Sequence, residues 1–73
     1  MSRIAAIGAS ELVDGYGLAG VEVLPAPDAA AARRAWASLG GDVGLVLLTP
    51  AAEAALGPEL AEARGVVWAV IPG

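Results

Sequence analysis

The chain has 73 residues, a mass of 7.1 kDa and a net charge of −4, and its length suits one small domain over residues 1–73. It has no cysteine, histidine or lysine, which excludes disulfides, thiolate or imidazole zinc sites, Ser-His-Asp triads, Schiff bases and P-loop lysines. We therefore expect a protein that is not an enzyme and has no cofactor, and the acidic balance disfavours nucleic acid and anionic membranes as partners.

Four apolar runs, rich in Val, Ile and Leu, alternate with three segments that have helical punctuation. The runs cover Arg3–Gly8, Val21–Leu24, Val43–Leu48 and Gly65–Ile71. Such runs predict strands buried on both faces of a parallel sheet, and none approaches the roughly 20 residues that span a bilayer. The first run is also too short for the core of a signal peptide. We therefore expect a cytoplasmic protein without direct membrane insertion.

The segment between the first two runs predicts a short or irregular helix. Ser10 is placed to cap its first turn, and Gly20 to end it. An inward stripe at helical spacing begins with Leu12 and Tyr16 and continues to Ala19. Two glycines within it each weaken a helix by roughly 1 kcal/mol relative to alanine, so we expect the helix to be poorly formed.

The other two segments predict one regular helix and one interrupted helix. In the first, Asp28 is the cap, residues 29–39 propagate the helix, and Trp36 faces inward. In the second, Thr49-Pro50 is typical of a helix start, but Gly57-Pro58 falls inside the helical pattern. Because a proline within a helix costs about 3 kcal/mol, we expect a kink or two short pieces.

The resulting order, β-α-β-α-β-α-β, predicts a small doubly wound α/β domain. Crossovers between parallel strands are right-handed in about 98% of cases, which leads to a four-stranded parallel sheet of flavodoxin- or receiver-like topology. We prefer the strand order 2-1-3-4, although the pattern alone leaves other orders open. In that order the last strand is an edge strand, and one of its two apolar faces lacks a covering helix. We therefore expect the isolated chain to self-associate.

Two motifs of related folds are incomplete in this chain. Residues 15–20 spell G-x-G-x-x-G, but a dinucleotide site needs that turn directly after a strand and before a helix. Here the motif lies well after the first predicted strand and is followed by another strand. A phospho-receiver would need acidic residues after the first strand, an aspartate ending the third and a lysine, whereas this chain has Ala9-Ser10, Leu48-Thr49 and no lysine.

A set of short segments, found in order along the chain, resembles the F subunit of the vacuolar and archaeal-type (V/A-type) rotary ATPases. These segments are Ile4-Ala5-Ala6-Ile7-Gly8, Gly15-Tyr16-Gly17-Leu18-Ala19-Gly20-Val21, Asp42-Val43-Gly44-Leu45-Val46-Leu47-Leu48-Thr49 and Val70-Ile71-Pro72. The family usually has Phe in place of Tyr16, and it continues past the Ile-Pro with a helical segment that these 73 residues do not include. The resemblance implies a doubly wound domain on the central rotor stalk beside the D subunit, without catalytic residues, that helps to couple and regulate ATP turnover.

Three functions follow as hypotheses. The first is a non-catalytic stalk component, similar to the F subunit, acting by protein–protein contact in ATP-driven or ATP-forming proton transport, with Leu12, Tyr16, Trp68 and Val70 at the interface. The second is a small ligand-binding module that uses the switch-point loops, through Ser10 and Thr49. The same two residues also suit helix caps. The third is a stand-alone domain that associates with itself.

Overall fold

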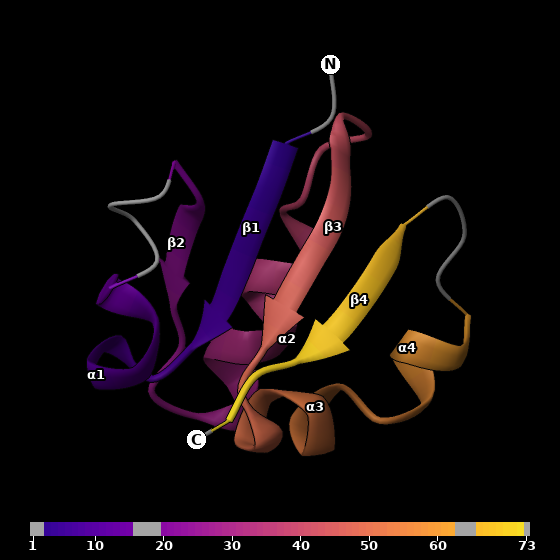
Figure 1. Ribbon diagram of the computed structural model, residues 1–73. Helices are drawn as coiled ribbons and strands as arrows, with labels where there is room; N and C mark the ends of the chain where they lie inside the picture. The colour runs from indigo at the N-terminus through magenta and orange to yellow at the C-terminus, as the bar shows by residue number, and fades with distance from the viewer. Residues whose placement is uncertain (1–2, 16–19, 63–65, 73) are drawn as a thin grey trace.

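The computed structural model describes residues 3–15, 20–62 and 66–72, and it confirms the predicted doubly wound α/β fold (Figure 1). One four-stranded parallel sheet has the order β2-β1-β3-β4. The strands are β1 Arg3–Gly8, β2 Glu22–Pro25, β3 Val43–Leu48 and β4 Val67–Val70. The helices are α1 Ser10–Val13, α2 Ala29–Ala37, α3 Pro50–Leu56 and α4 Pro58–Ala61.

The larger of two hydrophobic clusters lies between the sheet and the helices α2, α3 and α4. Successive side chains of a strand point to opposite faces, and alternate residues of β1 and of the second half of β3 enter this cluster, with Val43 joining them at the start of β3, where the register with β1 is irregular. Its buried members are Ala5, Ile7, Ala26, Ala32, Val43, Val46, Leu48, Ala52, Leu56 and Leu60. Trp36 packs against it, half-buried, as the helical spacing of α2 predicted.

The cluster on the other face is much smaller. Val13 of α1 packs there on Ala6 and Ile71, with Val23 and Leu47 partly buried beside them. Helix α1 lies over β1 and β2, so the cover on this face is concentrated at one side of the sheet. Among the residues that the structure describes, the two faces of the sheet are therefore unequally covered.

Local capping explains where α2 begins and ends. The Asp28 carboxylate accepts a hydrogen bond from the Ala31 amide at 2.8 Å, as the sequence predicted. The helix ends at Ala37, two residues before the predicted end at Leu39. Ser38 ends it, because its amide and its hydroxyl both donate to the carbonyl oxygen of Ala35, the hydroxyl at 2.8 Å.

The predicted interruption of the third helix is also confirmed. Thr49 caps α3 by accepting a hydrogen bond from the Ala52 amide at 3.2 Å. Gly57 then adopts φ +45° and ψ −117°, and Pro58 is the first residue of α4. None of the helices in the described part of the chain is long and apolar enough to cross a lipid bilayer.

The prediction that Ser10 caps the first helix is wrong. Ala9 is the N-cap residue, with φ −61° and ψ 141°, and Ser10 is already the first helical residue. The reason is the length of the connection, since β1 ends at Gly8 and a single residue turns the chain into α1. The predicted continuation of this helix through Tyr16 and Ala19 lies outside the described residues.

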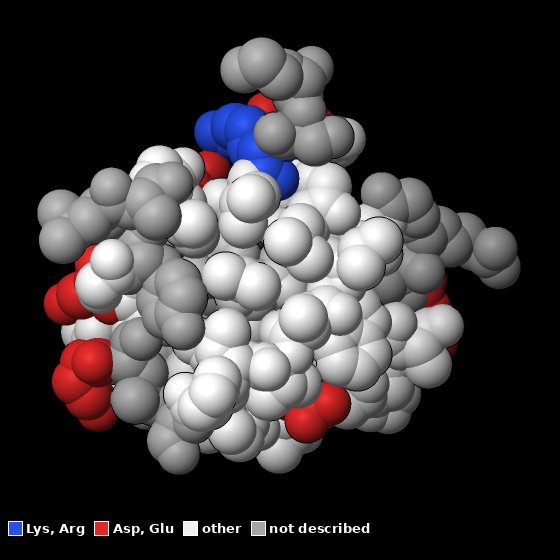
Figure 2. All heavy atoms as spheres, in the orientation of Figure 1, with Lys and Arg blue, Asp and Glu red and all other residues white. Residues whose placement is uncertain are grey.

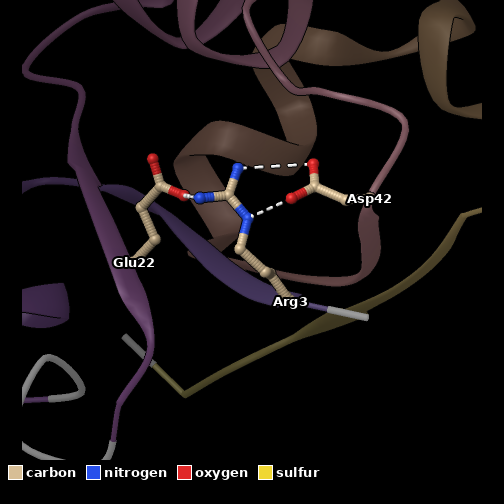
Figure 3. A network of polar contacts seen from close by, with 3 residues as sticks. All are labelled: Arg3, Glu22 and Asp42. Carbon is tan, nitrogen blue, oxygen red and sulfur yellow. Dashed lines mark hydrogen bonds and ion pairs between the residues drawn. The ribbon is translucent and has the colours of Figure 1, made fainter. Parts of the chain in front are cut away.

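Arg3 joins three segments at the amino end of the sheet (Figure 3). Its guanidinium lies between the carboxylates of Glu22 and Asp42, with Nη1 3.1 Å from Glu22 Oε1 and Nε 2.6 Å from Asp42 Oδ2. All three side chains are about half exposed, and ion pairs of this kind contribute about 0–1 kcal/mol. Their main effect is to tie together the starts of the three neighbouring strands β1, β2 and β3.

Candidate functional site

A hollow of about 340 Å³ opens at the carboxyl ends of the strands. It lies where the strand order reverses between β1 and β3, the place where doubly wound sheets bind ligands. The residues that line it follow β1, β2 and β3 and continue into α2 and α3. They are Ala9, Ala26, Pro27, Asp28, Ala29, Ala32, Thr49, Pro50, Ala51, Ala52 and Ala55.

The chemistry of this hollow is limited. Asp28 and Thr49 are the polar side chains among the described lining residues, and each already accepts the capping hydrogen bond of a helix. The rest of that lining is alanine and proline, with no cationic side chain to bind a phosphate. Nor do the described residues form any group of three or more side chains able to hold a metal ion.

The structure places the two predicted ligand-loop residues differently. Thr49 is buried in the wall of the hollow and packs directly on Gly8 at the end of β1. Ser10 is exposed in the first turn of α1 and does not belong to the lining. Thr49 therefore has a structural role, as the cap of α3 and as the packing partner of Gly8, whether or not a ligand enters the hollow.

A second candidate is the sheet face that carries α1. The register pairs Ile4 with Leu45, and Leu45 in turn with Val67, so their side chains lie on one face. Leu47 pairs with Ala69 on the same face. We call these five residues, Ile4, Leu45, Leu47, Val67 and Ala69, the open lane. Ile4 is 39% exposed and Val67 67%.

The open lane is apolar and lies beside α1. In Figure 1, α2 lies behind the sheet, whereas none of the described helices crosses in front of β3 and β4. Figure 2 shows the visible described surface on this side as mostly uncharged, with basic atoms at the top, acidic atoms at the left and right edges and one acidic group in the lower part of the face. Monomeric proteins rarely expose contiguous apolar patches of more than a few hundred Å², and larger ones mark interaction sites.

The four predicted interface residues are not brought together here. Leu12 belongs to α1, but its side chain, like the whole of Tyr16, lies outside the described residues. Trp68 is half-buried against the larger cluster, on the face opposite the open lane. Val70 pairs with Leu48, on Trp68's side of the sheet, and is 40% exposed at the edge. A binding role for these residues stays a prediction.

Sequence reasoning missed the members of the open lane. It singled out β4, but from that strand it chose Trp68 and Val70, whereas the lane contains Val67 and Ala69. The available signal was the alternation of side chains along the strand. That signal could not separate the two faces, because both sets of alternate residues are apolar.

The chain has no counterpart among the proteins with which it was compared. No protein-family model matches it, and no significant match was found among curated proteins or solved structures. Two surfaces of the described structure remain as candidate sites. One is a small hollow with little chemistry, and the other is an apolar sheet face suited to binding another protein.

Proposed function

We propose that this chain is a non-catalytic interaction domain and that its protein partner covers the open lane. The observation that carries the proposal is the unequal cover of the sheet. Parallel sheets occur almost only with both faces covered, yet here Ile4 and Val67 are exposed on an apolar face. A partner that removed this surface from water would gain about 25 cal/mol per Å² of apolar area before the costs of association.

The resemblance to the F subunit of the rotary ATPases suggests the specific form of this function. We propose a component of the central rotor stalk, bound beside the D subunit, that acts through contact when proton transport is coupled to ATP. Support comes from the doubly wound sheet, which is the fold that the resemblance implies. Gly8 of the first motif and Thr49 of the third pack on each other. This contact gives a structural reason for the two residues to occur together.

Coexpression with the D subunit of the source organism's rotary ATPase tests this function. We expect a 1:1 complex that survives size exclusion at about 10 µM. Val67→Lys places a charge in the open lane and should weaken the complex roughly tenfold. The matched control is Ala54→Lys, which adds the same charge at an exposed position of α3, the helix that packs into the larger cluster through Ala52 and Leu56.

Two results would contradict the stalk assignment. One is the absence of a complex between the unmodified chain and the D subunit, with both proteins folded. The other is equal weakening by Val67→Lys and Ala54→Lys, which would show an effect of net charge and not of the open lane.

A second candidate is a ligand site in the hollow at the switch point. Its volume of about 340 Å³ falls within the range of about 300–1,000 Å³ that is common for small-molecule sites. The alanine and proline lining with one carboxylate, Asp28, would suit a small apolar ligand that is neutral or carries a positive charge. A thermal-shift screen of apolar amines tests it, with Ala29→Leu filling the hollow as the control.

A further inference from the structure

We propose that the occupant of the open lane is a single amphipathic α-helix of a protein partner, with an aliphatic stripe flanked by lysine or arginine. This inference rests on the proposed function, because it specifies what the interaction domain binds. It depends on the width of the lane, on its length and on the distribution of charge around it.

The width of the open lane matches one helix. Neighbouring strands lie about 4.8 Å apart, so a four-stranded sheet offers room for two helices packed side by side at 8–10 Å. The opposite face of this sheet carries such a pair, since α2 and α3 contact each other across it. On the lane's face, α1 lies over β1 and β2 and packs on Ala6 through Val13. The remaining strip, towards β3 and β4, has the width of one more helix.

The length of the lane sets the length of the helix. Strand β3 has six residues, and at about 3.3 Å per residue it runs for about 20 Å. A helix rises 1.5 Å per residue, so about 13 residues, or between three and four turns, would cover the strip. Five aliphatic side chains lie along the strip, of which Leu47 is already partly covered by the smaller cluster under α1, and such a row fits an apolar stripe at i, i+3, i+4 and i+7.

The available area disfavours a second copy of this chain as the occupant. The domain measures 28 × 27 × 19 Å, so its broad side has a projected area of about 750 Å². A standard stable interface buries about 800 Å² on each partner. Helix α1 already takes part of the broad side, so the lane alone falls short of that area. A single helix needs less, and it would bind in the weak, micromolar range.

The charges favour a basic helix. The chain carries −4 in total, and the exposed Glu11 and Asp14 lie in and just after α1. Arg3 is already paired with two carboxylates. Because a second copy would bring the same negative charge, it would meet repulsion where a helix with basic flanks would meet attraction.

A designed peptide tests this inference directly. The probe has about 14 residues, with leucine at i, i+3, i+4 and i+7 positions, lysine on both flanks, alanine elsewhere and blocked ends. Two control peptides replace its lysines by glutamate or scramble its order. Each is titrated into ¹⁵N-labelled protein, and amide shifts report the site. We expect saturable 1:1 binding with Kd of about 50 µM and shifts centred on β3 and β4.

Variants of the chain sharpen the test. Val67→Lys should weaken binding of the lysine peptide by at least tenfold or so, whereas Ala54→Lys should leave it within about twofold. Ala69→Lys is a second lane variant at an exposed position, should Val67→Lys disturb the fold as judged by its amide spectrum. The glutamate peptide should bind at least about tenfold more weakly than the lysine peptide.

Several outcomes would overturn the inference. These are the absence of saturable binding up to about 1 mM peptide, shifts centred on α2 and α3, equal binding of the glutamate and lysine peptides, and a dimer buried through the lane that the peptide does not displace.

The proposed function fails separately. If the peptide fails but a Val67-dependent complex with the D subunit forms, the lane docks something other than a lone basic helix. If the peptide binds but the D subunit does not, the stalk assignment falls and the helix site stands.

Discussion

At the scale of single residues, the junction between β1 and β3 depends on the contact between Gly8 and Thr49. Thr49 is buried, and a Cβ atom built on Gly8 would collide with its side chain, coming within 2.7 Å of Oγ1. Gly8 does not have a positive φ, so the backbone conformation does not require glycine there. Glycine is needed because only a residue without a Cβ atom allows this close approach. The same threonine caps α3, so two local requirements meet at the carboxyl end of the sheet.

Gly8→Ala should therefore destabilise the domain. Overpacking of a well-packed core costs about 1–3 kcal/mol, and here the colliding neighbour is a buried side chain directly after a strand. Urea unfolding followed by circular dichroism measures the effect. Gly41→Ala is the control, because a Cβ on Gly41 meets nothing within 4 Å. Equal stability of the two variants would mean that Thr49 moves aside freely.

Thr49→Val should remove the cap of α3 while keeping the shape that packs on Gly8. Loss of an N-cap hydrogen bond costs about 1 kcal/mol, and the Ala52 amide would lose the acceptor that lies 3.2 Å away. Thr49→Ser keeps the hydroxyl oxygen and should cost less than Thr49→Val in the same urea measurement. The opposite ranking would show that the methyl group of Thr49 matters more than its hydroxyl.

At the scale of elements, the break between α3 and α4 follows from two adjacent residues. Gly57 has φ +45° and ψ −117°, a conformation that L-residues rarely adopt, and Pro58 begins the next helix. Leu56 and Leu60, on either side of the turn, are both buried in the larger cluster, so the interruption does not remove either piece from the core.

Gly57→Ala should destabilise the domain by about 1–3 kcal/mol through backbone strain. Crowding is a lesser matter, since a Cβ at this position would lie 3.7 Å from the Ala54 carbonyl oxygen, an ordinary contact. Chemical synthesis of the 73-residue chain allows a matched control, with D-alanine at position 57. Thermal unfolding should rank D-alanine above L-alanine, and the reverse order would exclude the backbone explanation.

At the scale of the whole molecule, the unequal cover of the sheet has consequences for its behaviour in solution. Strand β4 is an edge strand, with Val67 and Val70 exposed and no charge or proline within it. Natural proteins usually protect such edges, because unpaired strand groups template further pairing. The same molecule carries a net charge of −4, which opposes contact between copies.

We expect weak self-association of the isolated chain, with an average mass above 7.1 kDa by sedimentation equilibrium at about 100 µM. Added salt should strengthen it by screening the negative charge. A clean monomer at that concentration, at both low and high salt, would contradict the expectation.

We also expect no nucleotide cofactor to bind. Strand β1 leads directly into α1 without the glycine turn of a dinucleotide site, and residues 15–20 come just before β2 instead. The described lining of the hollow offers a carboxylate and no cation to a phosphate. Calorimetric titration with NAD, FAD and ATP measures this, and a Kd at or below about 10 µM for any of them would contradict the prediction.

Local signals in the sequence were sufficient to locate most of the elements. The apolar runs matched β1 and β3 over their full lengths, and Asp28, Thr49 and Gly57-Pro58 marked the helix starts and the break. These features depend on neighbours within a few residues, so a linear pattern contains them. The wrong prediction of a cap at Ser10 shows where such local patterns fail. The connection between β1 and α1 is a single residue, and its length is known only when both elements have been placed.

The strand order, and which apolar face of β4 the described helices leave exposed, were decided by the tertiary structure. The sequence by itself determined an alternating α/β chain with an apolar last strand, and 2-1-3-4 was a preference among possible orders. The composition of β4 could not show which of its two faces is exposed. Both sets of alternate residues are apolar, so only the positions of the helices cover Trp68 on one face and leave Val67 exposed on the other.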